Sequence, residues 1–320
     1  MSGTAAASAA PNCRNVREFT CNTSRSRSSN ALYKPPSAIP AAAITALALR
    51  VRSRRNAWLA LSLSALVVGI WYQTIQPRQD RIWTADVAHS VTADINDDQI
   101  TLHNVRDFNW TTDTVATPVW EDRTYNLADL TSTDMITSVW DDPKIAHLIV
   151  SFGFADNRHI AFSVEIRKEQ GESFSTVGGF FRQFELVLIA ADENDIVRVR
   201  TNLRKEDVHL FPVKLNEAQR RTLFLSYLGL GNDLAKTPEF YNTVTANCTS
   251  AVYRLVQVIK PDLPLDYRLL YSGLLPEYID ELHGLPGDMP MAQRRLAGAS
   301  TAKAQSIMPG QDYSALIRTN

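Results

Sequence analysis

The longest apolar run in the chain extends from Ala57 to Ile75 and contains 19 residues without a charge. As a helix it would be ~28 Å long at ~1.5 Å per residue, close to the ~30 Å hydrocarbon core of a bilayer. Four arginines stand just before the run, whereas Arg78 and Arg81 after it are offset by Asp80. The pattern predicts an uncleaved transmembrane helix over 56–76, with residues 1–55 in the cytoplasm and the remainder outside.

A cleavable signal peptide is the alternative interpretation of this run. No small-residue cleavage site follows Ile75, and the run exceeds the ~7–15 residues of a usual signal-peptide core. The shorter stretch from Ile39 to Leu49 is interpreted as an interfacial or partial second segment, and residues 1–37, rich in Ser, Arg and Asn, are predicted to be disordered.

Two runs beyond the apolar segment predict a β-hairpin, His147–Phe154 and His159–Arg167, joined by the turn-like ADNR. Side chains on a strand alternate between faces, so pairing Phe154 with Ile160 brings the apolar sets of both strands together. The opposite face then carries a polar row, which consists of His147, Ser151, Ser163 and Glu165.

Further patterns predict an antiparallel sheet with helices, an α+β fold. Expected strands are Gln99–Val105 at an edge, Glu185–Ala190, Ile196–Thr201 after the acidic turn ADEND, and a short one near Val208–Phe211. A helix starts at the cap Asn216, with Gln219 three residues on, and buries Leu223, Phe224, Tyr227 and Leu228. It should end near Gly229–Gly231 or restart toward Ala235. We expect a linker with edge strands over 77–119, the main domain over 120–287 and a C-terminal tail over 288–320.

The net charge of −1 hides an asymmetry. Residues 1–55 carry nine Lys and Arg against one acidic residue, so the remainder is acidic overall. Such a body has no electrostatic footprint for nucleic acid, and a nucleic-acid binder is excluded. No Gly-rich phosphate loop, His-x-x-x-His pair or Gly-x-Ser-x-Gly elbow occurs. We therefore expect no cofactor and no metal.

Cys248 is the one cysteine outside the basic leader, which holds Cys13 and Cys21. A lone cysteine is most often a small buried hydrophobe. Here it lies in the first turn of a helix predicted from Val252, Leu255, Val256 and Ile259 and ending before Pro261. Asn247 or Thr245 would cap this helix, and a position at a helix N-terminus lowers the pKa of a thiol. A reactive thiolate is therefore a candidate.

A nucleophilic thiol needs a base, and the base needs an orienting acceptor. His89, His103, His209 and His283 are interpreted as surface or structural residues, and His159 begins a strand beside a turn. Only His147 shares a predicted sheet face with a carboxylate, Glu165. Cys248, His147 and Glu165 thus form the most economical constellation.

Four segments resemble the bacterial membrane family named for the Lnb N-terminal periplasmic domain. They are YNTVTANCTSAV, AHLIVSFGFADNRHIAFSVEIRKEQGESFS, FFRQFELVLIAADENDIVRVRTNLRKEDVHLFPVKL and the closing DYSALIR, and the resemblance covers roughly Trp120 to Arg318. That family is similar to circularly permuted papain-like folds of the NlpC and lecithin:retinol acyltransferase kind, in which a strand histidine precedes a cysteine that opens a helix.

The resemblance implies Cys248 as nucleophile, His147 as base and Glu165 as orienter. It also implies acyl transfer on bacterial lipoproteins as the founding activity. Where the family often has Gly and Tyr after the first acidic residue of the turn, this chain has Asn157, Arg158 and His159. His159 is therefore a reserve base.

The resulting hypothesis is a periplasm-facing thiol acyltransferase or hydrolase, anchored in the inner membrane, that acts on a membrane lipid or lipoprotein. Candidate oxyanion donors are the Cys248 backbone N–H and the side chains of Asn247 or Asn242. A catalytically silent envelope scaffold that binds lipid through the same groove is the alternative, and a peptidoglycan endopeptidase is a third reading by fold analogy alone.

Overall fold

The computed structural model describes residues 53–175 and 177–319. The stretches 1–37 and 39–49 discussed above lie outside the described residues. The chain divides into two units at Ile70, and the last turn of α2 (Arg54–Thr74) belongs to the second unit. Among the described residues, α2 is the one helix long and apolar enough to cross a membrane. It coincides with the predicted span over 56–76.

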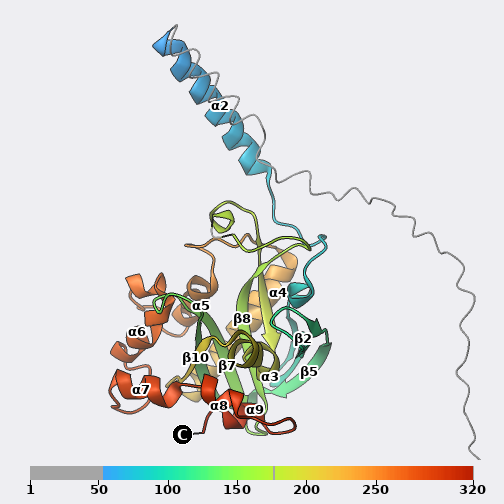
Figure 1. The fold of residues 1–320 in the computed structure, drawn as a ribbon, viewed down its shortest axis with the longest axis vertical. Coiled ribbons are helices and arrows are strands. Elements are labelled where there is room, and N and C mark those ends of the chain that lie inside the picture. The colour runs from blue at the N-terminus through green and yellow to red at the C-terminus, as the bar shows by residue number, and fades with distance from the viewer. Residues whose placement is uncertain (1–52, 176, 320) are drawn as a thin grey trace, which may run out of the picture. The chain divides into compact units, whose positions relative to one another are not determined.

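The second unit is built on an eight-stranded sheet with the order β1-β2-β9-β8-β7-β6-β10, and β5 pairs with β2 as well (Figure 1). β3 and β4 form a separate two-stranded sheet. The strands are β1 Thr92–Asn96, β2 Gln99–Arg106, β3 Asn109–Trp110, β4 Ala116–Thr117, β5 Trp120–Asn126, β6 Leu130–Val139, β7 His147–Phe154, β8 His159–Arg167, β9 Glu185–Ala191 and β10 Asp207–Pro212.

Helices cover both faces of this sheet. α4 and α5 pack on one face, and α3, the π-helical stretch η5 and the C-terminal α8 and α9 (red in Figure 1) pack on the other. The helices are α3 Glu193–Ile196, η5 Val199–Arg204, α4 Glu217–Lys236, α5 Cys248–Gln257, α6 Leu275–Glu281, α7 Met291–Gly298, α8 Thr301–Gln305 and α9 Tyr313–Leu316. Short 3-10 turns are η2 Ala85–Val87, η3 Leu127–Asp129, η4 Gly178–Phe180, η6 Tyr267–Leu269 and η7 Ser272–Leu274.

The hydrophobic core follows from the two-residue period of the strands. Phe152 and Phe162 point toward α4, where they meet Phe224 and Tyr227 with edge-on ring contacts at 5.1–5.8 Å. The alternate residues of the same strands face the second layer, and β9 is buried along its whole length. A central strand with both sides covered reads as a continuous apolar run, as ELVLIAA does.

The predicted hairpin is confirmed, with the strand limits expected from the sequence. Its register is shifted by two residues, because Phe152 rather than Phe154 pairs with Ile160. The turn is tighter than assumed, since the Phe154 N–H bonds the Arg158 carbonyl at 3.0 Å and Asn157 takes a positive φ of 65°. A shift of two keeps every side chain on its predicted face.

The strand expected over Ile196–Thr201 is wrong, because this segment is helical in α3 and η5. Asp192 caps α3 by accepting the Asn194 N–H, and the alternation IVRVR is misleading because Arg200 is buried as an ion-pair partner. A strand would expose that arginine.

Three further expectations need correction. α4 has its predicted capping box at Asn216 but continues through Gly229 and Gly231 to Lys236. β2 is not an edge strand, since β1, β5 and β9 all pair with it. The sheet is also not purely antiparallel, because β2 and β9 pair in parallel through Arg106 and Ala191.

The segments expected as linker and tail both contribute to the folded unit. Residues 77–119 supply β1 and β2, whose Ile100, Leu102 and Val105 lie in the main core. Residues 288–320 supply α7 to α9, and Arg318 pairs with the buried Asp134 and Glu193. The folded unit therefore extends beyond the predicted domain of 120–287 at both ends.

Candidate functional site

Cys248 is the first residue of α5, as predicted. Asn247 is the cap, and its side chain accepts the Ser250 N–H while the Ser250 hydroxyl accepts the Asn247 N–H. This reciprocal capping box fixes the direction in which the chain enters the helix. The thiol therefore sits at the positive end of the α5 dipole, beside N–H groups that have no partner within the helix.

His147, Ser163 and Glu165 meet at the first residue of β7. The register that pairs Ile149 with Ser163 places His147 on β7 opposite Glu165 on the neighbouring strand β8. His147 Nε2 lies 2.6 Å from the Ser163 hydroxyl and 3.1 Å from Glu165 Oε1. The Ser163 hydroxyl in turn donates to Glu165 Oε1 at 2.8 Å. The imidazole thus has both a direct and a serine-bridged link to a carboxylate.

The His147 side chain is also close enough to the Cys248 thiol for each group to shift the pKa of the other. Ser163 and Glu165 engage Nε2, so Nδ1 is the ring nitrogen available to a further partner. The backbone N–H of Leu148, next to His147, also lowers the pKa of this thiol, and the Thr249 hydroxyl lies 3.9 Å from the sulfur. The structure therefore brings the three predicted residues together with Ser163 between two of them.

The electrostatics of this group favour a thiolate and an imidazolium. Burial is the largest influence on Cys248 and opposes its ionisation, but the hydrogen bond and charge of His147 and the Leu148 N–H lower the thiol pKa below its usual value. For His147, burial is again the largest influence on the pKa and favours the neutral ring. The charge of Glu165 and the thiol hydrogen bond outweigh it and raise the pKa of His147 to about 9.

Sequence reasoning missed a second row of charges behind Glu165. Arg200 on η5 lies 3.2 Å from Glu165 and 3.3 Å from Glu206, and Glu206 also accepts a hydrogen bond from Ser138. Arg200 was assigned to a strand, and no local pattern links it to residues on β6 and β8. The alternation in IVRVR predicted a strand, and nothing in it marks Arg200 as a buried ion-pair partner.

The expected supporting residues have other tasks. Asn247 uses its amide to accept from Ser250 and to donate to the Thr243 carbonyl at 2.7 Å, so it is committed to capping. Asn242 accepts from the N–H groups of Val244 and Thr245 in a turn. His159 pairs with Gly153 at the far end of the hairpin, six residues from Glu165, and its ring bonds the Asn157 carbonyl. It is not in the Cys248 group.

An apolar cavity of about 100 Å³ is lined by residues that follow His147 and Cys248 in the chain, although neither of those two residues lines it. Leu148 and Thr249, the neighbours of His147 and Cys248 along the chain, line its wall, and Cys248 packs against the same apolar cluster. The remaining lining comes from β6, β7, α4, α5 and α6 and includes Met135, Val150, Leu223, Val252, Leu275 and Tyr278. A space suited to hydrocarbon thus lies within the apolar cluster against which Cys248 packs.

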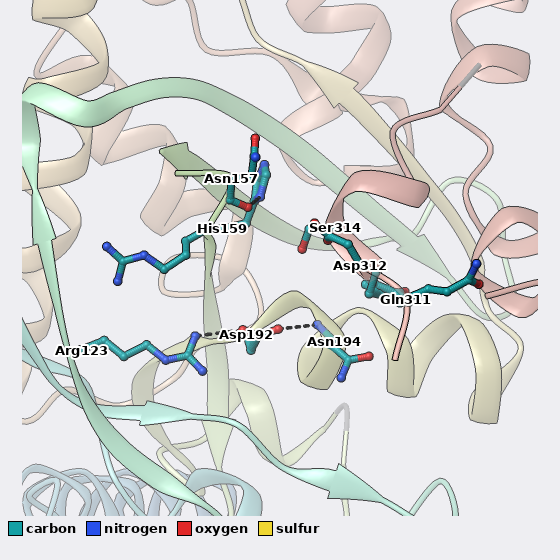
Figure 2. Close-up of a pocket in the computed structure, with 10 residues that line it drawn as sticks. Arg123, Asn157, His159, Asp192, Asn194, Gln311, Asp312 and Ser314 are labelled. Carbon is teal, nitrogen blue, oxygen red and sulfur yellow. Dashed lines mark hydrogen bonds and ion pairs between the residues drawn. The ribbon is translucent and has the colours of Figure 1, made fainter. Parts of the chain in front are cut away.

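A larger and polar cavity of about 210 Å³ lies elsewhere (Figure 2). Asn157 and His159 from the hairpin turn face residues 311–314, and Asp192 bonds Arg123 and the backbone of Asn194. Neither Cys248 nor His147 lines it. We assign the candidate active site to Cys248, His147 and Glu165, and of the two cavities the apolar one adjoins the cluster against which Cys248 packs.

Comparison with known proteins supports the resemblance read from the sequence. The Lnb N-terminal periplasmic domain matches residues 116–273. This range includes the hairpin, η5 and Cys248 but stops before α6 to α9 and the closing DYSALIR. No curated protein and no solved structure matches the chain.

Within the described ranges, 53–175 and 177–319, no group of three or more His, Cys, Asp or Glu residues is arranged to hold a metal ion. The periplasmic family and the apolar helix α2 together fit a membrane-anchored, envelope-related periplasmic protein. Residues 116–273 of this chain belong to the Lnb N-terminal periplasmic domain family.

Proposed function

We propose that this protein is a membrane-anchored, cysteine-dependent acyltransferase or hydrolase. Cys248 is the nucleophile, His147 the base, and Glu165, acting directly and through Ser163, orients the ring. The observation that carries the proposal is the placement of the Cys248 thiol near a histidine whose Nε2 contacts Glu165 directly and through Ser163. Nucleophile, base and orienting acceptor in contact are the arrangement that covalent catalysis requires.

The chemistry follows from these contacts. His147 takes the thiol proton, and the Cys248 sulfur attacks the carbonyl carbon of an ester or amide to give a tetrahedral oxyanion. The free N–H groups at the start of α5, that of Cys248 first, are placed to donate to this oxygen. When the intermediate collapses, the C–O or C–N bond breaks and His147 returns the proton to the leaving alcohol or amine. An amine or water then resolves the thioester by the same steps.

The apolar cavity supports an acyl chain as the transferred group. Ligand pockets commonly enclose ~300–1,000 Å³, so a cavity of about 100 Å³ takes only the part of a chain nearest the carbonyl. Its lining is apolar, and an alkyl group gains ~0.8 kcal/mol for each buried methylene. The substrate class we propose is therefore a lipid or lipoprotein ester or amide.

The location follows from charge and family. Positive charge before α2 and an acidic body favour an N-terminus in the cytoplasm and a domain in the periplasm, hence anchoring in the inner membrane. A cysteine at a helix start with its histidine on a neighbouring strand also supports a relationship to circularly permuted papain-like folds.

Acyl capture on Cys248 tests the function. Full-length protein with Cys13→Ser and Cys21→Ser, so that one thiol remains, is incubated in vesicles with diacyl phospholipid or an N-terminally acylated peptide. Intact mass spectrometry should show an acyl adduct that hydroxylamine removes. The adduct should be absent from a variant that also carries Cys248→Ser. Failure of every donor to modify a thiol that still reacts with iodoacetamide would favour the lipid-binding scaffold.

A further inference from the structure

A long connection joins β8 to β9 and exposes large apolar side chains. It spans the 17 residues 168–184, whereas loops longer than ~12–15 residues are uncommon and usually functional. Phe174, Val177 and Phe180 on it are 61%, 68% and 43% exposed. Ile82 and Val244, also exposed, are tied to it, because the Ile82 carbonyl accepts from Gln170 and the Thr243 N–H donates to Gly179. We call these five apolar residues the apolar rim.

The apolar rim is held next to the end of α2. The Arg182 guanidinium donates to the carbonyls of Tyr72 and Ile75 at 2.9 and 3.0 Å and lies 4.6 Å from the Tyr72 ring. Tyr72 lies in the last turn of α2 and Ile75 directly follows the helix, where the helix end carries partial negative charge. Arg182 adopts a positive φ of 42°, a costly conformation for a non-glycine residue, which these bonds support.

Chain length limits how far the apolar rim can lie from this turn. A residue spans at most ~3.5 Å, so Phe180 is within ~7 Å and Val177 within ~17 Å of Arg182 along the chain. The interfacial layer of a bilayer is itself several ångströms deep on each side of the ~30 Å core. Apolar side chains in this position fit the headgroup layer at which α2 leaves the bilayer.

We propose that the apolar rim is a membrane-contact surface that enters the interfacial layer of the bilayer spanned by α2. The apolar rim is also connected by hydrogen bonds to the candidate active site. The Gly179 carbonyl bonds Thr243, and the Thr243 carbonyl accepts from Asn247, the cap of the helix that Cys248 opens. Two hydrogen bonds thus connect the lipid-facing loop with the nucleophile. The proposal rests on α2 as a membrane span and not on the chemistry of Cys248.

A fluorescent label that senses lipid tests this surface. Full-length protein carrying Cys13→Ser, Cys21→Ser and Cys248→Ser receives Val177→Cys, is labelled with a nitrobenzoxadiazole probe and is reconstituted into vesicles of phosphatidylethanolamine and phosphatidylglycerol. The control is Leu296→Cys on α7, an apolar residue that is 77% exposed. The label at 177 should emit at shorter wavelength and lose most of its emission when doxyl-labelled lipid is included, whereas the label at 296 should not.

Equal emission and equal quenching at both positions would overturn the proposal, because both labels would then lie in the same medium. A second label, Phe174→Cys, guards against a local disturbance at 177 and should behave as 177 does. Since the thiol of Cys248 is absent from all these variants, the result does not depend on whether the protein transfers acyl groups.

Discussion

The guanidinium of Arg200 lies 3.2 Å from the carboxylate of Glu165. The ring of His147 approaches the same oxygen at 3.1 Å, so Glu165 is held between two basic groups. Burial is the largest effect on Glu165 and favours its neutral form, but the charge and hydrogen bond of His147, then the charge of Arg200, hold its pKa well below the usual range. A fixed negative charge therefore stands behind the imidazole at neutral pH.

Glu165→Gln should impair activity more than Ser163→Ala. The glutamine keeps an acceptor but removes the charge that raises the His147 pKa, whereas Ser163→Ala leaves Glu165 3.1 Å from the ring. We expect both losses in kcat/KM to be smaller than the ~10²- to 10⁴-fold loss from His147→Ala. Acyl-adduct formation by the three variants gives the order, and a Ser163→Ala loss equal to that of Glu165→Gln would mean that the serine bridge is the essential link.

The pH dependence of the thiol follows from the two shifted pKa values. Because the Cys248 pKa is lowered, the rate of alkylation by iodoacetamide should reach half its maximum at a lower pH than for an ordinary thiol. Acyl transfer also needs the imidazolium as acid, and the His147 pKa is about 9, so kcat/KM should fall as the pH rises through about 9.

Glu165→Gln provides the control for this profile. Loss of the charge should move the falling limb from about pH 9 toward neutral pH and the thiol pKa upward. The raised pKa of His147 also affects the free energy of unfolding. Its stabilising contribution is fully present below the ordinary histidine pKa of 6.5 and is lost as the pH rises through about 9. An alkylation profile of the native protein centred on the ordinary thiol pKa would contradict the ion pair.

Much of the candidate site could be predicted from sequence because its parts lie on elements with strong local patterns. The two-residue period put His147, Ser163 and Glu165 on one face, and a register error of two residues left that face unchanged. The cap at Asn247 put Cys248 at a helix start. Each of these inferences used only the pattern of residues within one strand, one hairpin or one helix start.

Arg200 and the Leu148 N–H could not be found in the same way. Arg200 reaches Glu165 only because the segment after Asp192 folds as α3 and η5, and a buried ion pair across 35 residues leaves no periodic signal. The Leu148 N–H is a backbone group, which sequence does not distinguish. Long-range packing thus determines the electrostatics of the site, while local patterns determine its members.

Asp195→Ala should destabilise the fold although it lies outside the site. Asp195 is fully buried and accepts from Arg106, the Phe108 N–H and the Trp110 indole at 2.6–3.1 Å. Removing this carboxylate leaves the buried guanidinium of Arg106 without its ion-pair partner, which costs ~3–5 kcal/mol. Urea unfolding of the full chain in detergent measures the loss. The control is Asp98→Ala, which breaks an exposed pair with Arg221 and should change the free energy of unfolding little.

Fusion reporters test the orientation of the membrane segment. Alkaline phosphatase joined after Arg81 should be active, because the phosphatase folds only outside the cytoplasm, and a β-galactosidase joined there should be inactive. The nine Lys and Arg before the apolar run, against one acidic residue, are the reason for this expectation. The opposite pair of activities would place the domain in the cytoplasm and would remove the periplasmic assignment of the active site.

The final prediction concerns Cys248 and His147 as one unit. Cys248→Ser keeps nearly the same volume at the start of α5 but lacks a thiolate at neutral pH, so activity should be abolished while the fold is retained. His147→Ala should be nearly as damaging, because it removes both the base and the hydrogen bond that lowers the thiol pKa. The double variant should be little worse than either single one, since groups that act in one step are not additive. Acyl-adduct formation and complementation of a deletion strain measure the effects. Losses that simply multiply would show that the two residues act independently, and full complementation by Cys248→Ser would leave lipid binding, without catalysis, as the role of this site.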